Sequence, residues 1–377
     1  MCQNDNEKNI DPIHDDPLVN EFKEEWYGYL CDAHCHVHDD KERHKDIPLL
    51  QTGHITLMGV RQDDWNIVEN ITQLTNSKDN NKCIPCFGIH PWYTYRVMTE
   101  EQQYKAINDS NEQHQEEQQQ SSATTTDTTL FYEAILEGPD KKEKQELISF
   151  LPAPIPYTEW YQQLEALLQR YPKAIVGEVG LDRSARILPK GAIEWHGVKP
   201  TSVVCHIDHQ YNVLQLQLKL AIQYQRSVSL HCVQSQGHVL KLCQWANQYI
   251  KQHYDIKKKE KEAKERKKVK KLNICLHSFG GKPASIQQFL HFTHLDIYVS
   301  FSTAINARLG WHKLSQLIQS VPDHLLLIES DFNTPKDLDH AMVRIACLVA
   351  RAKQWSLHDT LLTTNKNWSQ FTGVSLE

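Results

Sequence analysis

The sequence predicts an α/β protein built as a (β/α)8 TIM barrel, and two observations lead to this prediction. Eight short, nearly continuous apolar segments recur along the 377 residues, which is the pattern of strands buried on both faces of a parallel sheet. Helical patterns separate many of these segments, and strands that alternate with helices are typical of such barrels. The expected strands cover residues 29–36, 54–60, 82–91, 174–182, 227–232, 272–281, 295–303 and 325–331.

The helical pattern is clearest in residues 157–171, where Trp160, Leu164, Leu167 and Leu168 fall on one stripe. Similar patterns occupy 211–225, 283–292 and 336–353. A doubly wound open sheet is the structural alternative. No GxGxxG follows an expected strand, so a dinucleotide site has no support.

Composition narrows the function classes. Hydrophobic residues make up 40% of the chain, and the net charge of -6 gives no overall attraction to nucleic acid. No apolar run approaches the ~20 residues that span a bilayer, and the polar, acidic N-terminus does not resemble a signal peptide. We therefore expect no membrane association, a cytoplasmic or nuclear location, and reduced cysteines. Cys83 and Cys86 form a CxxC, but no second pair completes a zinc site.

Ionisable residues gather at the ends of the expected strands. His34 and His36 end the first strand, and because side chains two apart share a face, both can bind one metal ion. Other strands end in His90, Glu178, His231, His277 and Asp331. Barrel active sites lie at the C-terminal ends of the strands, so the fold is expected to gather all seven around one mouth. Histidine with carboxylate suits Zn²⁺ or Mn²⁺ better than an all-oxygen Mg²⁺ site.

The motifs at these strand ends resemble those of a known family. DAHCHVH, GIHP, GEVGLD, SLHC, LHSFGG and ESD occur in order between about residues 29 and 350. Together they are similar to the TatD-type metal-dependent hydrolases, the TatD-related deoxyribonuclease family, which is a (β/α)8 branch of the amidohydrolase-like enzymes. The pattern looks closest to a fungal branch that is described as interacting with a cell-cycle protein.

The resemblance implies a role for each strand-end residue. His34 and His36 bind a first divalent metal ion with Asp331, Glu178 bridges to a second, and His231 and His277 complete the second site. His90 faces the substrate, and Asp182 supports the site without binding metal. The implied activity is hydrolysis of DNA phosphodiesters, in which two cations activate water and stabilise the leaving oxygen. Asp331 also serves as the base.

Two departures from the family pattern keep other functions open. Val233 stands where family members often carry an arginine, and residues 332–334 replace a small residue followed by proline. One alternative is therefore a catalytically weak barrel that acts as a protein-interaction partner in cell-cycle regulation. Another is a hydrolase of a different ester or amide, although such enzymes commonly place a lysine where this chain has Glu178.

The chain is expected to form a polar tail over residues 1–27 and a single barrel domain over 28–377, with insertions at about 96–156, 183–208 and 257–271. The first insertion holds the polar tract 111–129, for which plain disorder is the favoured interpretation over a mobile fringe of the mouth. His196, His206 and His209 are expected on a lid or the surface, with a role as extra metal ligands as the alternative. The basic run 257–271 is interpreted as a solvated helical extension. The alternative interpretations are a nuclear-import signal or a contact with a partner protein.

Overall fold

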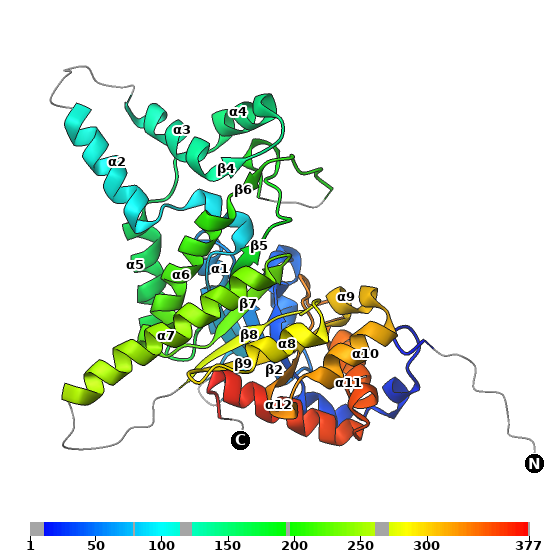
Figure 1. Cartoon of the computed structure of the whole chain (residues 1–377). Helices are drawn as coiled ribbons and strands as arrows, with labels where there is room; N and C mark the ends of the chain where they lie inside the picture. Colours follow the sequence, from blue (N-terminus) through cyan, green and yellow to red (C-terminus); the bar gives the residue numbers. More distant parts are fainter. Residues whose placement is uncertain (1–10, 78–79, 114–122, 194–196, 261–270, 376–377) are drawn as a thin grey trace, which may run out of the picture.

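The computed structural model describes residues 11–77, 80–113, 123–193, 197–260 and 271–375. Eight parallel strands form a nearly closed barrel, in the order β1-β2-β3-β5-β7-β8-β9-β10 (Figure 1). The strands are β1 (Cys31–Cys35), β2 (His54–Met58), β3 (Cys83–Phe87), β5 (Ile175–Asp182), β7 (Val228–Val233), β8 (Leu272–Leu276), β9 (Leu295–Phe301) and β10 (Leu326–Ile328). All eight expected strands are confirmed.

The segment that follows the last strand returns to the C-terminal end of the first strand through hydrogen bonds. His36 N–H donates to the carbonyl oxygen of Phe332 at 2.7 Å, and Asp331 N–H donates to that of His34 at 2.9 Å. The buried Asp32 carboxylate accepts from both the backbone N–H and the hydroxyl of Ser330. These bonds bring the two ends of the chain to the same side of the mouth.

Helices surround the barrel because each buries one apolar face against the strands. In α5, Trp160, Leu164, Leu167 and Leu168 are buried, as the sequence pattern predicts. The outer helices are α1 (Trp65–Thr75), α5 (Tyr157–Arg170), α6 (Ile207–Tyr224), α7 (Gln236–Glu260), α8 (Pro283–Phe289), α10 (Trp311–Ser320), α11 (Leu338–Lys353) and α12 (Leu357–Thr372). No helix among the described residues is both long and apolar enough to cross a membrane.

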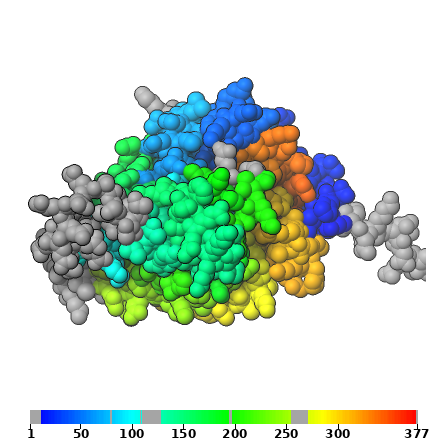
Figure 2. All heavy atoms as spheres, turned by 90° about the horizontal axis from the view of Figure 1, so that it is seen from above, coloured from blue at the N-terminus to red at the C-terminus, as the bar shows by residue number. Residues whose placement is uncertain are grey.

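Two of the insertions pack against each other and form a small second core, which we call the cap. Its elements are α2 (Glu100–Gln113), α3 (Ala123–Ile135), β4 (Leu136–Glu137), α4 (Lys141–Phe150) and β6 (Val204–Cys205). Strands β4 and β6 pair antiparallel, and the cap lies together on one side of the barrel (Figures 1 and 2). Its buried residues include Tyr132, Ile135, Leu147, Ile187 and Val203.

The cap corrects the expectation of plain disorder for the tract 111–129. Residues 111–113 end α2 and 123–129 begin α3, while 114–122 lie outside the described residues. The prediction was wrong for these helical residues because it relied on the polar composition of the tract. The apolar residues that pack α3 into the cap begin at Phe131, after the tract.

His209 is not a lid or surface residue. It is buried, its Nε2 lies 3.0 Å from the carbonyl oxygen of Thr94, and its Nδ1 lies 3.2 Å from Gln102 Nε2. It therefore joins α6 to the start of the cap. His206, half exposed, caps α6 by accepting from Asp208 N–H, and His196 lies outside the described residues.

Two further segments can be compared with the sequence predictions: the N-terminal tail and the basic run. Within the expected tail, Ile13 is buried and Asp16 accepts two hydrogen bonds from Arg351 at 2.8 and 3.0 Å. Residues 13–21 therefore pack on α11, and residues 24–29 contact α12. In the basic run, residues 257–260 continue α7, whereas 261–270 lie outside the described residues.

Candidate metal centre

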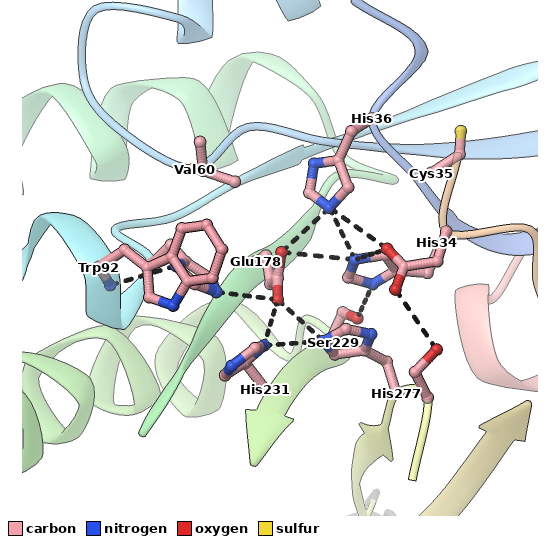
Figure 3. A network of polar contacts seen from close by, with 12 residues as sticks. His34, Cys35, His36, Val60, Trp92, Glu178, Ser229, His231 and His277 are labelled. Carbon is pink, nitrogen blue, oxygen red and sulfur yellow. Dashed lines mark hydrogen bonds and ion pairs between the residues drawn. The ribbon is translucent and has the colours of Figure 1, made fainter. Parts of the chain in front are cut away.

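The seven predicted strand-end residues come together at the C-terminal ends of the barrel strands (Figure 3). They form three overlapping groups whose nitrogen and oxygen atoms lie within 4.8 Å of one another. The groups are His34, His36 and Glu178; His34, His277 and Asp331; and His90, Glu178 and His231. Every residue that the sequence placed at the mouth is therefore found there.

One oxygen of Glu178 faces the pair of histidines from β1. Glu178 Oε2 lies 3.1 Å from His36 Nε2 and 3.4 Å from His34 Nε2. Asp331 completes this side, with Oδ1 3.7 Å from His36 Nε2 and 3.8 Å from His34 Nε2. The two histidine nitrogens are 3.1 Å apart, so donor atoms from three strand ends converge on a small volume.

The other oxygen of Glu178 faces three different histidines. Glu178 Oε1 lies 2.8 Å from His277 Nε2, 2.9 Å from His231 Nδ1 and 3.1 Å from His90 Nε2. Glu178 thus stands between two sets of nitrogens, one for each oxygen. This is the arrangement that a carboxylate bridging two cations requires.

Electrostatics in this crowded site favour a negative Glu178 and divide the histidines into two sets. Burial acts to lower the pKa of His277 and His231, but hydrogen bonds and charge from neighbouring carboxylates outweigh it and raise both pKa values. Burial would raise the pKa of Glu178, but His90, His277 and His34 together hold it well below its usual range. Burial lowers the pKa of His90 to about 4 and also lowers that of His34. Neutral imidazole nitrogens are the form that binds metal.

His36 differs from His34 and His90 in its charge. Burial opposes protonation of His36, yet its hydrogen bond to Glu178 and the nearby carboxylates raise its pKa to about 9. The buried carboxylates cannot balance imidazolium on all five rings, so the charges are divided unequally. A bound cation supplies positive charge without requiring any of these rings to be protonated.

Neighbouring side chains orient the ligands of the centre. His231 Nε2 lies 3.1 Å from Asp182 Oδ2, which also accepts from Trp92 Nε1 at 2.8 Å. His34 Nδ1 lies 2.8 Å from the Ser229 hydroxyl. Such partners of a metal-binding histidine select its tautomer and hold its ring in place.

Glu329, Ser229 and Trp92 were not identified from the sequence. Glu329 Oε1 lies 3.6 Å from His277 Nδ1, and its carboxylate accepts from the hydroxyls of Ser278 and Ser300. The available signals were weak: Glu329 stands two residues before Asp331 in ESD, and Ser229 two residues before His231 in SLHC.

A glycine allows β5 to lie close to β7 beside the centre. A Cβ at Gly180, the second glycine of GEVGLD, would lie 2.2 Å from the carbonyl oxygen of His231. Any larger residue would push the two strands apart. The motif therefore includes a packing requirement as well as two acidic side chains.

The cysteine pair of the CIPC stretch is remote from this chemistry. Cys83 and Cys86 are both buried in β3. Burial raises the pKa of Cys83 to about 12 and that of Cys86 well above its usual range. Both thiols therefore remain protonated, which disfavours metal binding and disulfide exchange.

A parallel eight-stranded barrel with histidines and carboxylates at its C-terminal mouth defines the metal-dependent hydrolase class. The family model described as TatD related DNase matches residues 31–373. The chain belongs to this family and is a TatD-family hydrolase.

Two relatives extend the comparison. Cut9-interacting protein scn1 of Schizosaccharomyces pombe is 31% identical over 360 residues, covering 92% of this chain and 99% of the relative. A Saccharomyces cerevisiae protein named as an uncharacterized deoxyribonuclease is 25% identical over 310 residues, covering 80% and 83%. The expected resemblance to a fungal branch is confirmed.

Solved structures share the fold. A TatD homologue from Escherichia coli covers 93% of this chain and 100% of its own, with 15% identity and a TM-score of 0.53. A TatD family hydrolase from Entamoeba histolytica covers 91% and 97%, with 14% identity and the same TM-score. At these identities the likeness concerns the barrel itself.

Proposed function

We propose that the protein is a divalent-metal-dependent phosphodiesterase that hydrolyses DNA. The observation that carries this proposal is the position of Glu178, whose Oε2 faces His34 and His36 and whose Oε1 faces His231 and His277. A carboxylate shared in this way suits two cations a few ångströms apart, which is the arrangement used for phosphoryl transfer.

The donor set fits such ions. His34, His36, Asp331 and Glu178 would hold one ion, and Glu178, His231 and His277 the other. Imidazole with carboxylate is a donor set that suits Zn²⁺ or Mn²⁺. Bound there, the ions would supply Lewis acidity toward a phosphoryl oxygen and lower the pKa of water.

The protein's own side chains then have defined tasks. Asp331 receives the proton of the attacking water on its carboxylate. His90 is neutral at physiological pH because burial lowers its pKa to about 4. Its Nδ1 accepts from Trp92 N–H and its Nε2 faces Glu178 Oε1, so its ring borders the place of the substrate phosphate. Asp182 keeps the His231 ring oriented from its far nitrogen.

A metal-dependent cleavage assay tests the proposal. The full chain is stripped with chelator, reloaded with Mg²⁺, Mn²⁺ or Zn²⁺, and given single-stranded and double-stranded DNA beside an Asp331→Ala variant. We expect cleavage that returns with metal and that the variant lacks. Protein that binds two ions but cleaves neither DNA with any metal would contradict the proposal.

A second candidate function is binding of a protein partner, favoured by the 31% identical relative named as interacting with Cut9. Such binding does not require catalysis. Recombinant Cut9 should therefore bind the Asp331→Ala variant as well as the wild type. Absence of binding to both proteins would remove this candidate.

A further inference from the structure

Trp92 lies at the mouth, where it supports Asp182 and contributes no metal ligand of its own. Its indole N–H donates to Asp182 Oδ2 at 2.8 Å, and its ring meets the His90 ring edge to face, with centroids 5.2 Å apart. Figure 3 shows Trp92 beside the residues of the centre. The residue is nevertheless 40% exposed. A large aromatic ring that is held rigidly yet open to solvent, beside the residue assigned to the phosphate, suits stacking of an unpaired base.

Arg183 follows Asp182 at the end of β5 and is exposed. Its backbone N–H donates to the carbonyl oxygen of Val233 at 3.2 Å. Val233 ends the neighbouring strand β7 and carries no charge. The backbone of Arg183 is therefore fixed at the mouth of the barrel, beside an uncharged strand end.

In the part of the chain that the structure describes, no acidic side chain pairs with the charge of Arg183. Its guanidinium has no hydrogen-bond or ion-pair partner among those residues. The turn that carries it is well ordered, because Asp182 Oδ1 accepts from Ser184 N–H and Oγ at 2.7 Å each and from Ala185 N–H at 3.1 Å. A guanidinium so placed is suited to a phosphate group.

We propose that Trp92 and Arg183, on either side of Asp182, bind one nucleotide of the substrate. The base stacks on Trp92, and a phosphate pairs with Arg183. This inference rests on the proposed phosphodiesterase function and adds to it the residues that recognise the substrate.

Salt-dependent binding tests the role of Arg183. The metal-loaded full chain is titrated with a labelled single-stranded oligonucleotide whose phosphorothioate linkages resist hydrolysis. Arg183→Gln is expected to weaken binding and to reduce the slope of log K against log salt by about 0.7, the value for one phosphate contact on a single strand. Arg183→Lys should retain the slope. A wild-type slope in Arg183→Gln would overturn the proposal.

Two further variants sharpen this test. Arg186 lies on the same turn, but its guanidinium donates to the carbonyl oxygens of Ser184 and Ala185 at 3.4 and 3.5 Å. Arg186→Gln is thus the matched control and should leave the slope unchanged. Adding Val233→Arg to Arg183→Gln returns a cation to the same corner of the mouth and should restore the slope, and failure to do so would overturn the phosphate contact at this corner.

An abasic oligonucleotide tests the role of Trp92. Trp92→Ala should weaken binding of a normal oligonucleotide roughly 5- to 150-fold, the range that stacking of one base supplies, and leave abasic binding unchanged. Trp92→Phe should retain most of the affinity. An equal loss on both oligonucleotides would show that the ring only holds Asp182 in place, which would overturn the stacking.

The two proposals fail separately. Cleavage of a normal oligonucleotide with metal tests the phosphodiesterase, whereas phosphorothioate binding tests the nucleotide contacts. Binding that depends on Trp92 and Arg183 without cleavage would overturn only the former. Cleavage that is insensitive to both residues would overturn only the latter.

Discussion

The backbone N–H of Asp331 donates to the carbonyl oxygen of His34 at 2.9 Å. This bond joins residues at opposite ends of the chain and brings both side chains to one side of the proposed centre. Asp331 has a φ of 55°, a left-handed conformation that aspartate tolerates better than most residues. The group of ligands that contains His34 and Asp331 therefore forms only when the barrel closes, which couples metal binding to folding.

Metal removal should destabilise the protein because of this coupling. If free metal was 100-fold above its Kd, chelation is expected to lower the free energy of unfolding by about 2.7 kcal/mol. Thermal melts with and without chelator measure the change. A His34→Ala variant should lose most of this sensitivity, and an identical response in the variant would contradict a ligand role for His34.

Glu178→Gln should release metal from both sites, because one carboxylate serves both sets of histidines. Metal analysis of purified protein is expected to show two equivalents in the wild type and a loss at both positions in the variant. Glu159→Gln, an exposed change on α5, is the control. Full metal content in Glu178→Gln would show that the bridging assignment is wrong.

Asp331→Asn should reduce DNA cleavage by roughly 10²- to 10⁴-fold, the range that a positioned acid or base contributes. The amide keeps the shape of the side chain but cannot take the proton. Cleavage rates at saturating metal measure the effect, with exposed Asp323→Asn as the matched control. Activity within twofold of the wild type would exclude Asp331 as the base.

Acid should loosen the attachment of the cap through His209. Burial lowers the pKa of His209 to about 4, so the folded state favours the neutral ring. Its contribution is fully present above the unfolded pKa near 6.5 and is lost as the pH falls toward 4. Urea unfolding across this range should show wild-type stability falling by up to about 1.4 kcal/mol per pH unit from this one proton.

The matched variant for this prediction is His209→Gln, which cannot titrate. It should be less stable than the wild type at pH 7.5, because the hydrogen bonds of His209 to Thr94 and Gln102 are altered. Its stability should nevertheless depend less steeply on pH between 6.5 and 4. Parallel curves for the two proteins would assign the acid sensitivity to other groups.

The barrel could be predicted because its signals are local. Each strand is a short apolar run, and α5 shows its buried stripe within 14 residues. The cap could not be predicted in this way. Strands β4 and β6 have two residues each and lie on opposite sides of β5 in the sequence, so their pairing is a long-range contact without a local pattern.

The sequence by itself determined the barrel class and the seven ionisable residues at its mouth, because strand periodicity and parallel topology place strand ends together. Only the tertiary structure decided which of these residues face each oxygen of Glu178. It also decided that the backbone of Arg183 lies next to that of Val233. Both depend on the register between neighbouring strands. That register results from packing across the whole barrel, which no single segment of the sequence records.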